Sequence, residues 1–366
     1  MKSGSRVWAI GLCCSAVLVF LLTFVGPKGA STELRTLPAR SVEAGLSEAR
    51  PEDLHPRGGW LSASHSSQLL LQHEAPPRKK LLAVVGVQTG FTTNHGDDRY
   101  NYEARRKVLR STWFPANQSA LDRFEASTKI LLTFVLGHSE DQQAEEGVQL
   151  ESEDHGGFMR LPVQEAYLSL TNKTLLFLKQ TISTYEAEFI VKVDDDVLLR
   201  LDRLPAAISQ WTQRGSDYIG CMKNGEIYTS DKYRWYEPQH QLLGGGQYFT
   251  HAWGPVYVLS WRIAREVSQL NPNSLRFFNN EDVTVGGWML ALNGRHDDER
   301  RLCEPICTDT SIAVYDYPRC AGLCEPVKQM QGLWNSTACQ LPALSGSDQT
   351  LPQTPPFYKF QHQKLK

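Results

Sequence analysis

The sequence predicts an α/β domain with a parallel sheet, and two features of the chain support this class. Short apolar runs rich in β-branched residues alternate with longer segments whose apolar residues recur near helical spacing. Turn-forming residues bound the apolar runs, as expected for strands buried on both faces of a sheet. Strands that alternate with helices are joined by crossover connections, so we expect neighbouring strands to be parallel.

The predicted strands are the apolar runs Lys80–Val87, Lys129–Leu136 and Phe189–Val193. Between them, the sequence predicts helices at Tyr102–Trp113 and Gln164–Tyr185. In an open α/β sheet the ligand lies beyond the carboxyl ends of the strands. Residues that directly follow a strand are therefore the first candidates for a functional site.

The composition excludes several classes of protein. The chain has 366 residues, with 38 Lys and Arg against 40 Asp and Glu, so it lacks the basic surplus of a nucleic-acid-binding protein. Hydrophobic residues make up 41% and charged residues 21%, which is enough apolar surface for a large core. This composition excludes wholesale disorder and a fibrous repeat, and it fits one large domain or two small ones.

The N-terminal region predicts a membrane anchor. Residues 7–25 form an uninterrupted apolar run, which at about 1.5 Å per residue spans the roughly 30 Å hydrocarbon core of a bilayer. Lys2 and Arg6 precede the run and only Lys28 follows it closely, so residues 1–6 are expected in the cytosol and the rest in the lumen. A cleavable signal peptide is the alternative, but the run is longer than usual for one.

The anchor and the folded domain are separated by a segment of different composition. Residues 26–78 are rich in proline and charged residues, and we interpret them as a flexible stem, because they bury too little apolar surface to offset the entropy of ordering. Residues 341–366 are again polar and proline-rich, which predicts a flexible C-terminal tail. The folded domain is therefore expected to span residues 79–340.

Lumenal placement predicts disulfide bonds, because the secretory compartments are oxidising. The cysteines concerned are Cys221, Cys303, Cys307, Cys320, Cys324 and Cys339. Their pairing stays open, since this number of cysteines allows many combinations. A four-thiolate zinc site formed by the four cysteines from Cys303 to Cys324 is the less favoured alternative. Glycosylation sequons at Asn117, Asn172 and Asn335 agree with a lumenal domain.

An acidic cluster directly follows the third predicted strand. Asp194, Asp195 and Asp196 leave this strand in succession, and their mutual repulsion is most naturally offset by a divalent cation. The alternative is a polar turn in which one aspartate caps the next element and the others face water. The position at the carboxyl end of a strand favours the metal site.

A second acidic pair opens a predicted helix. Glu281 and Asp282 follow Asn279 and Asn280 and precede an apolar stretch. In one interpretation an asparagine caps the helix and the acids complement its dipole. In the other, one carboxylate points into the site as a general base. These residue types alone leave both interpretations open.

Four motifs occur in an order typical of one enzyme family. They are Arg105–Trp113, Phe134–Gly137, Phe189–Val197 and Asn280–Gly286. In these motifs the chain resembles the β-1,3-galactosyltransferases and their N-acetylglucosaminyltransferase relatives, over about residues 80–339. The resemblance implies a single-pass type II protein of the Golgi membrane. It also implies the GT-A fold, a Rossmann-like mixed sheet with a DxD motif.

The later part of the chain resembles the plant-type branch of this family. The matching segments are Trp235–Pro238, Tyr248–Ala252 and Cys320–Cys324. Members of that branch add galactose to hydroxyproline on arabinogalactan-type glycoproteins or extend their β-1,3-galactan chains. The resemblance therefore implies UDP-galactose as the donor and a glycoprotein or glycan as the acceptor. Gly244–Gly246 and Trp253 differ from the common family pattern, which leaves the acceptor open.

The resemblance also implies a metal site. Asp196 is expected to bind Mn²⁺ directly, with Asp194 near the ribose or the metal-bound waters and His296 completing the metal shell. Carboxylate and phosphate oxygens suit Mg²⁺ and Mn²⁺ equally, whereas an imidazole ligand favours Mn²⁺. Because His296 lies in a polar stretch, a solvated loop histidine is the alternative.

Further contacts to the donor are expected from side chains near the first strand and in the aspartate cluster. They are Thr89, Arg105, Arg106, Arg110 and Asp195. The arginines follow the first strand in helical order, where guanidinium groups suit uracil or phosphate. Arg105 and Arg106 cannot share one face of a helix, so at least one of them is expected at the surface or in a structural role.

For the reaction, the resemblance implies an inverting single displacement. The acceptor hydroxyl attacks the anomeric carbon opposite the diphosphate, with Asp282 as the general base and Glu281 as the alternative base. Either carboxylate is expected to have a modestly raised pKa because of partial burial.

Three other functions compete with this one. A UDP-N-acetylglucosamine-dependent transferase of the same family differs only in the donor. A non-catalytic, membrane-tethered carbohydrate-binding protein would stack sugars on aromatic rings such as Trp211, Trp235 and Tyr236, but it has no need of both acidic motifs. A metal-dependent hydrolase leaves Glu281, Asp282 and the arginine-rich helix unexplained. The oligomeric state is left open.

Overall fold

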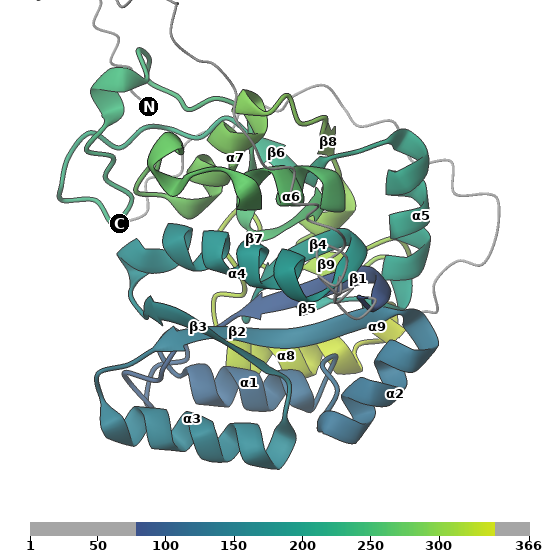
Figure 1. Cartoon of the computed structure of the whole chain (residues 1–366). Coiled ribbons are helices and arrows are strands. Elements are labelled where there is room, and N and C mark those ends of the chain that lie inside the picture. Colours follow the sequence, from purple (N-terminus) through teal and green to yellow (C-terminus); the bar gives the residue numbers. More distant parts are fainter. Residues whose placement is uncertain (1–77, 341–366) are drawn as a thin grey trace, which may run out of the picture. The chain divides into compact units, whose positions relative to one another are not determined.

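The computed structural model of the chain describes residues 78–340 (Figure 1). The predicted cytosolic segment, membrane anchor and C-terminal tail lie outside the described residues, as does the predicted stem except for Arg78. Within residues 78–340, no helix combines the length and the apolar character needed to cross a bilayer.

A seven-stranded sheet forms the centre, in the order β3-β2-β1-β4-β7-β6-β8. Its strands are β1 (Lys80–Gln88), β2 (Ile130–His138), β3 (Phe158–Gln164), β4 (Glu186–Asp194), β6 (Tyr218–Lys223), β7 (His251–Ser260) and β8 (His296–Asp298). A separate two-stranded antiparallel sheet pairs β5 (Leu198–Leu199) with β9 (Ala313–Val314).

The sheet is mixed rather than parallel throughout. The strands β3, β2, β1 and β4 pair in parallel, as predicted, but β7 runs antiparallel to both β4 and β6. The prediction of a parallel sheet is therefore wrong for β7, although β6 and β8 again pair in parallel. A mixed sheet agrees with the GT-A expectation. Its cause is the direction of β7, which lies between β4 and β6 although it follows both in the chain.

The three predicted strands are confirmed as β1, β2 and β4. All three are buried along most of their length, which explains their continuous apolar sequences. β1 and β4 are neighbours, and their register sets Gln88 opposite Asp194. The residues that follow these two strands consequently meet at one edge of the sheet.

The α-helices are α1 (Tyr102–Arg110), α2 (Gln118–Thr128), α3 (Gln142–His155), α4 (Leu170–Thr184), α5 (Leu204–Arg214), α6 (Trp261–Gln269), α7 (Glu281–Ala291), α8 (Pro326–Asn335) and α9 (Thr337–Gln340). Short 3₁₀ helices are η1 (Tyr167–Ser169), η2 (Leu201–Arg203), η3 (His240–Leu242), η4 (Pro272–Ser274) and η5 (Arg300–Leu302).

Both predicted helices are shorter than expected. The first ends at Arg110, because the hydroxyls of Ser111 and Thr112 bond back to the carbonyl of Val108 and compete with helix continuation. The second begins only at Leu170, since Gln164 is the last residue of β3. β3 escaped prediction because it contains a proline, which an edge strand tolerates.

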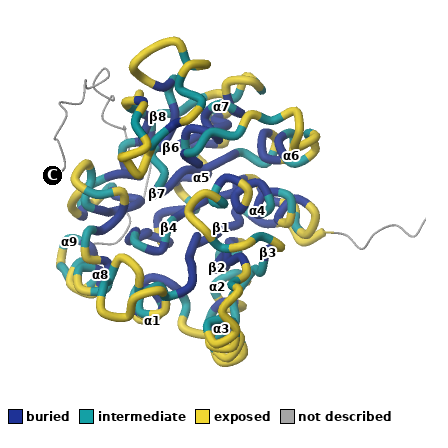
Figure 2. Tube along the Cα trace, turned by 90° about the vertical axis from the view of Figure 1, so that its left-hand side faces the viewer, coloured by how far each residue is buried: buried dark blue, intermediate teal, exposed yellow. Residues whose placement is uncertain are grey.

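Helices cover both faces of the sheet (Figure 1). One face packs with α1, α2, α5 and α8 in a core that includes Val85, Leu109, Phe134, Trp211 and Met330. The other face packs with α4, α6 and α7, in a core that includes Val84, Phe177, Ile190, Ile263 and Met289. Figure 2 shows the buried strands between these layers, with the most exposed residues in the loops and on the outer helices.

The six cysteines of the described residues form disulfides, as predicted. The pairs are Cys221–Cys303, Cys307–Cys339 and Cys320–Cys324. This pairing excludes the zinc alternative, because the four cysteines of that motif are divided among three bridges. The asparagines of all three sequons are exposed.

Candidate active site

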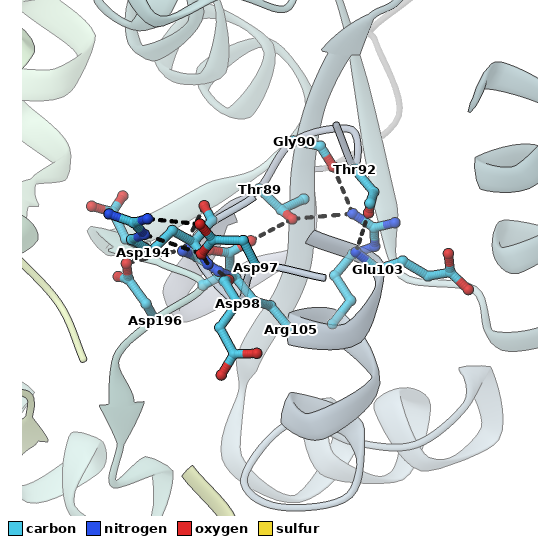
Figure 3. Close-up of polar contacts among 12 residues, drawn as sticks. Thr89, Gly90, Thr92, Asp97, Asp98, Glu103, Arg105, Asp194 and Asp196 are labelled. Atoms are coloured by element: carbon cyan, nitrogen blue, oxygen red, sulfur yellow. Dashed lines mark hydrogen bonds and ion pairs between the residues drawn. The ribbon is translucent and has the colours of Figure 1, made fainter. Parts of the chain in front are cut away.

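The three aspartates that leave β4 have different surroundings. Asp195 is buried, with an exposed fraction of 2%, and its carboxylate accepts hydrogen bonds from Thr89 Oγ1 and Arg105 Nη1, both at 2.7 Å. The same guanidinium nitrogen of Arg105 lies 3.2 Å from Asp196 Oδ2. Figure 3 shows Thr89 and Arg105 beside the aspartates. Asp195 therefore fixes the turn internally, and Asp194 and Asp196 remain as candidate ligands.

Asp196 has one carboxylate oxygen without a donor among the described residues. Its Oδ1 is buried and accepts no hydrogen bond. Burial raises the pKa of Asp196 to about 8, and the charge of Asp194 adds to this effect, although Arg105 opposes it. Gly322 closes over this carboxylate, because a Cβ built there would lie 2.2 Å from Oδ1. A desolvated oxygen of this kind is one that a cation would satisfy.

Lys192 connects the aspartate cluster with the second acidic motif. Its Nζ lies 2.6 Å from Asp194 Oδ1 and 3.9 Å from Glu281 Oε2, and it donates a hydrogen bond to the carbonyl of Gly254. Burial alone would lower the pKa of Lys192, but Asp194 and Glu281 raise it, so the ammonium stays charged. The motifs meet because β4 pairs with β7 and α7 packs on β7.

Glu281 and Asp282 open α7, yet their environments differ. Glu281 is buried and accepts hydrogen bonds from Tyr257 Oη and from Thr174 Oγ1. Burial raises its pKa, in spite of Lys192. Asp282 Oδ2 lies 3.0 Å from Lys223 Nζ, and 16% of its side chain is exposed. Asp282 is therefore the carboxylate of the pair that a substrate can reach.

The expected modest increase in pKa is wrong for Asp282. Burial alone would raise its pKa, but Lys223 and His251 outweigh burial and lower it to about 2. Burial in turn lowers the pKa of His251 to about 4, so this ring is uncharged at neutral pH. Lys223 is consequently the group that keeps Asp282 ionised under working conditions.

Asn280 precedes this pair but does not cap the helix with its side chain. It occupies the N-cap position of α7, yet its amide makes no capping hydrogen bond. Instead its Nδ2 donates to the carbonyl of Trp235 and to Tyr248 Oη. The capping interpretation is therefore wrong for Asn280, and Asp282 Oδ1 satisfies the amide of Val283.

The environment of His251 predicts a pH dependence of stability. Because its pKa is about 4 in the folded chain against 6.5 ordinarily, the unfolded chain binds the extra proton between these values. We expect the free energy of unfolding to fall by about 3 kcal/mol as the pH falls through this window. The groups that face the ring are Asp282, Lys223, and the carbonyl of Phe249.

Urea unfolding of the protein at a series of pH values measures this effect. The change His251→Gln should flatten the dependence between pH 6.5 and about 4, whereas His95→Gln, at an exposed site, should leave it as in the parent. An equally steep dependence in His251→Gln would show that another group is responsible.

The arginines of α1 divide into two sets. Arg105 contacts the aspartates, whereas Arg106 and Arg110 form ion pairs with Glu151 of α3. Arg106 also donates to Thr89 Oγ1 and so supports the loop after β1. The expectation that one of the adjacent arginines is structural is confirmed for Arg106. Glu151 escaped prediction, because its helix showed no motif.

The structure does not bring His296 to the aspartate cluster. It lies on β8 opposite Tyr218, three strands away from β4, which corresponds to roughly 14 Å at about 4.8 Å per strand. Its Nδ1 bonds the carbonyl of Gly294, and its ring packs edge-on against Tyr218. His296 therefore cannot share a metal ion with Asp196, and the predicted ligand role is corrected. It is also a strand residue, not a loop histidine.

Known proteins resemble this chain in sequence. The family model described as Galactosyltransferase matches residues 104–299. Over 262 residues the chain is 44% identical to probable beta-1,3-galactosyltransferase 12 of Arabidopsis thaliana, which covers 72% of this chain and 68% of the relative. It is 41% identical over 273 residues to probable beta-1,3-galactosyltransferase 13 of the same plant, with 74% and 77% covered.

These relatives define the chain as a hexosyltransferase, and its mixed sheet fits the GT-A fold. The chain belongs to the β-1,3-galactosyltransferase family. The matched residues include both acidic motifs and their connecting Lys192.

Proposed function

We propose that the protein is an inverting galactosyltransferase that moves galactose from UDP-galactose, in β-1,3 or β-O linkage, to a glycoprotein acceptor. The acceptor is a galactose chain or hydroxyproline. One observation carries this proposal: Lys192 holds Asp194 next to Glu281 at the start of α7, so the candidate metal site lies beside the helix end that carries the candidate base Asp282.

The residues present fit a divalent cation bound with the donor. In the part of the chain that the structure describes, no set of three or more His, Cys, Asp or Glu side chains forms a complete metal site. Mg²⁺ and comparable ions often take only one or two carboxylates and complete their shell with substrate phosphates. Asp194 and Asp196 would hold Mn²⁺ in this way. When bound, the ion would stabilise the charge of the departing diphosphate.

The side chains of the chain itself prepare the reaction. Arg105 orients Asp195 and Asp196, while Lys223 keeps Asp282 ionised. The acceptor oxygen forms a bond with the anomeric carbon as the bond to the diphosphate breaks, and its proton passes to Asp282. Glu281 is enclosed by Tyr257 and Thr174, which suits a positioning role better than proton transfer.

The proposal includes a Golgi membrane location, with type II topology and a lumenal catalytic domain. The apolar run at residues 7–25 and the three disulfides support it. The non-catalytic alternative loses one of its aromatic candidates, because Trp211 is completely buried. A UDP-N-acetylglucosamine donor remains the second candidate.

Donor turnover by the full-length protein in detergent tests the proposal. We expect transfer from UDP-galactose, not UDP-N-acetylglucosamine, to a β-galactoside or a hydroxyproline peptide, and we expect excess EDTA to abolish transfer and added Mn²⁺ to restore it. Transfer that persists in EDTA would overturn the metal step. Transfer from UDP-N-acetylglucosamine alone would show that this nucleotide sugar, and not UDP-galactose, is the donor.

A further inference from the structure

The connection between β6 and β7 carries an aromatic cluster that the reaction described above does not use. The rings of Tyr233 and Trp235 lie 5.2 and 5.8 Å from that of Tyr228. Tyr233 is 56% exposed and Trp235 is 36% exposed. Large rings gathered at the surface rather than in the core are a common sign of a binding site.

The cluster is attached to the start of α7. The carbonyl of Trp235 accepts a hydrogen bond from Asn280 Nδ2, and the carbonyl of Tyr236 accepts one from Asn279 Nδ2 at 2.8 Å. The completely buried Glu237 accepts another from the amide of Asn279. Asn279 and Asn280 directly precede Glu281 and Asp282. The loop is therefore fixed beside the candidate base by both asparagines.

A second contact joins this loop to the other side of the site. The guanidinium of Arg234 lies 4.5 Å over the ring of Tyr167 in η1. Burial raises the pKa of Tyr167, and Asp282 and Glu281 are close enough to add to this increase, against Arg234. Trp235 and Tyr167, from two separate segments, thus lie near the start of α7, which carries Asp282.

The chemistry of these groups fits a sugar ring. The C–H face of a pyranose packs on an aromatic face, while its hydroxyls bond to a Tyr hydroxyl, an indole N–H or a guanidinium. A nucleotide also stacks on aromatic rings, but the donor diphosphate belongs at Asp194 and Asp196. The rings lie near the candidate base Asp282. The acceptor hydroxyl has to approach from this side, because it gives its proton to the base.

We propose that Tyr233 and Trp235 form an acceptor subsite for the sugar next to the one that receives galactose. This inference rests on the proposed function and deepens it. An acceptor that fills the subsite needs at least a disaccharide, so the preferred acceptor is a galactose chain and not a lone hydroxyproline. Arg234 and Tyr167 border the same subsite.

Kinetics of the full-length protein with galactose acceptors of increasing length test the subsite. We expect Trp235→Ala to raise the KM for β-1,3-linked galactotriose by about tenfold, and to leave the KM for UDP-galactose and the hydrolysis of UDP-galactose unchanged. The parent should prefer galactotriose to a monosaccharide galactoside, and the variant should lose this preference. Trp235→Phe should recover most of the affinity. Tyr100→Ala, at another exposed ring, serves as the control.

Calorimetric titration of galactotriose without donor separates this inference from the proposed function. If no transfer occurs with any donor but galactotriose binds to the parent and not to Trp235→Ala, the subsite stands and the proposed function fails. If transfer occurs and Trp235→Ala has the same KM as the parent for acceptors of every length, the subsite is overturned. The subsite would also be overturned if Trp235→Ala raised the KM for the monosaccharide acceptor and for UDP-galactose as much as the KM for galactotriose. That pattern would indicate a general structural defect.

Discussion

Replacing Asp282 with asparagine is expected to reduce galactose transfer by about 10²–10⁴-fold while the protein keeps its fold. Asparagine has the same shape, and its side-chain oxygen can still accept the hydrogen bond from the amide of Val283. It cannot take the proton of the acceptor hydroxyl. The ion pair with Lys223 is lost, but 17% of the Lys223 side chain is exposed, so its ammonium is not left as a fully buried unpaired charge.

The measurement is turnover at saturating UDP-galactose, together with calorimetric binding of UDP. UDP affinity should stay within about twofold of the parent, because the donor site lies with the other acidic motif. Asp202→Asn, at an exposed aspartate of η2, is the matched control. Parental turnover in Asp282→Asn would contradict its assignment as the base and would redirect attention to Glu281.

The half of the fold that carries the three aspartates could be predicted from the sequence. β1, β2 and β4 are buried on both faces, so their apolar residues are continuous and stand out without knowledge of the fold. The other half depends on pairing across long connections. The antiparallel position of β7 between β4 and β6 follows from tertiary packing, which no local pattern in the chain expresses.

The dependence on tertiary packing also explains why the sequence predicted the wrong histidine at the site. His296 follows the acidic helix closely in sequence, but strand order places it on the far edge of the sheet. His251, by contrast, lies 3.8 Å from Asp282, because β7 returns to the centre. Lys192 could have been found from the sequence: a single lysine inside the apolar run Phe189–Val193 requires a buried partner, and that partner is Asp194.

Gly322 is the position where the smallest substitution should have the largest effect on the metal site. It belongs to the loop that Cys320 and Cys324 close, and the amide of the next residue, Leu323, donates to the carbonyl of Asp196 at 2.7 Å. Its φ of +117° is one that residues with a side chain rarely adopt. A methyl group there would overlap both carboxylate oxygens of Asp196.

We therefore expect Gly322→Ala to displace Asp196. The backbone strain should cost about 1–3 kcal/mol of stability, and the affinity for Mn²⁺ should fall by at least about tenfold, with a comparable loss of transfer. Electron paramagnetic resonance of free Mn²⁺ during titration in the presence of UDP measures the affinity independently of turnover. The thermal midpoint shows whether the variant is folded under these conditions.

Gly332→Ala provides the matched control, because it lies in α8 of the same C-terminal region and an added Cβ there meets no atom within 4 Å. It should leave Mn²⁺ affinity unchanged and slightly increase stability, since alanine favours a helix. If Gly322→Ala is folded and binds Mn²⁺ as the parent does, Asp196 is not the ligand. The buried oxygen of Asp196 that lacks a donor would then need another explanation, such as a carboxyl that stays protonated at neutral pH, in accord with its raised pKa.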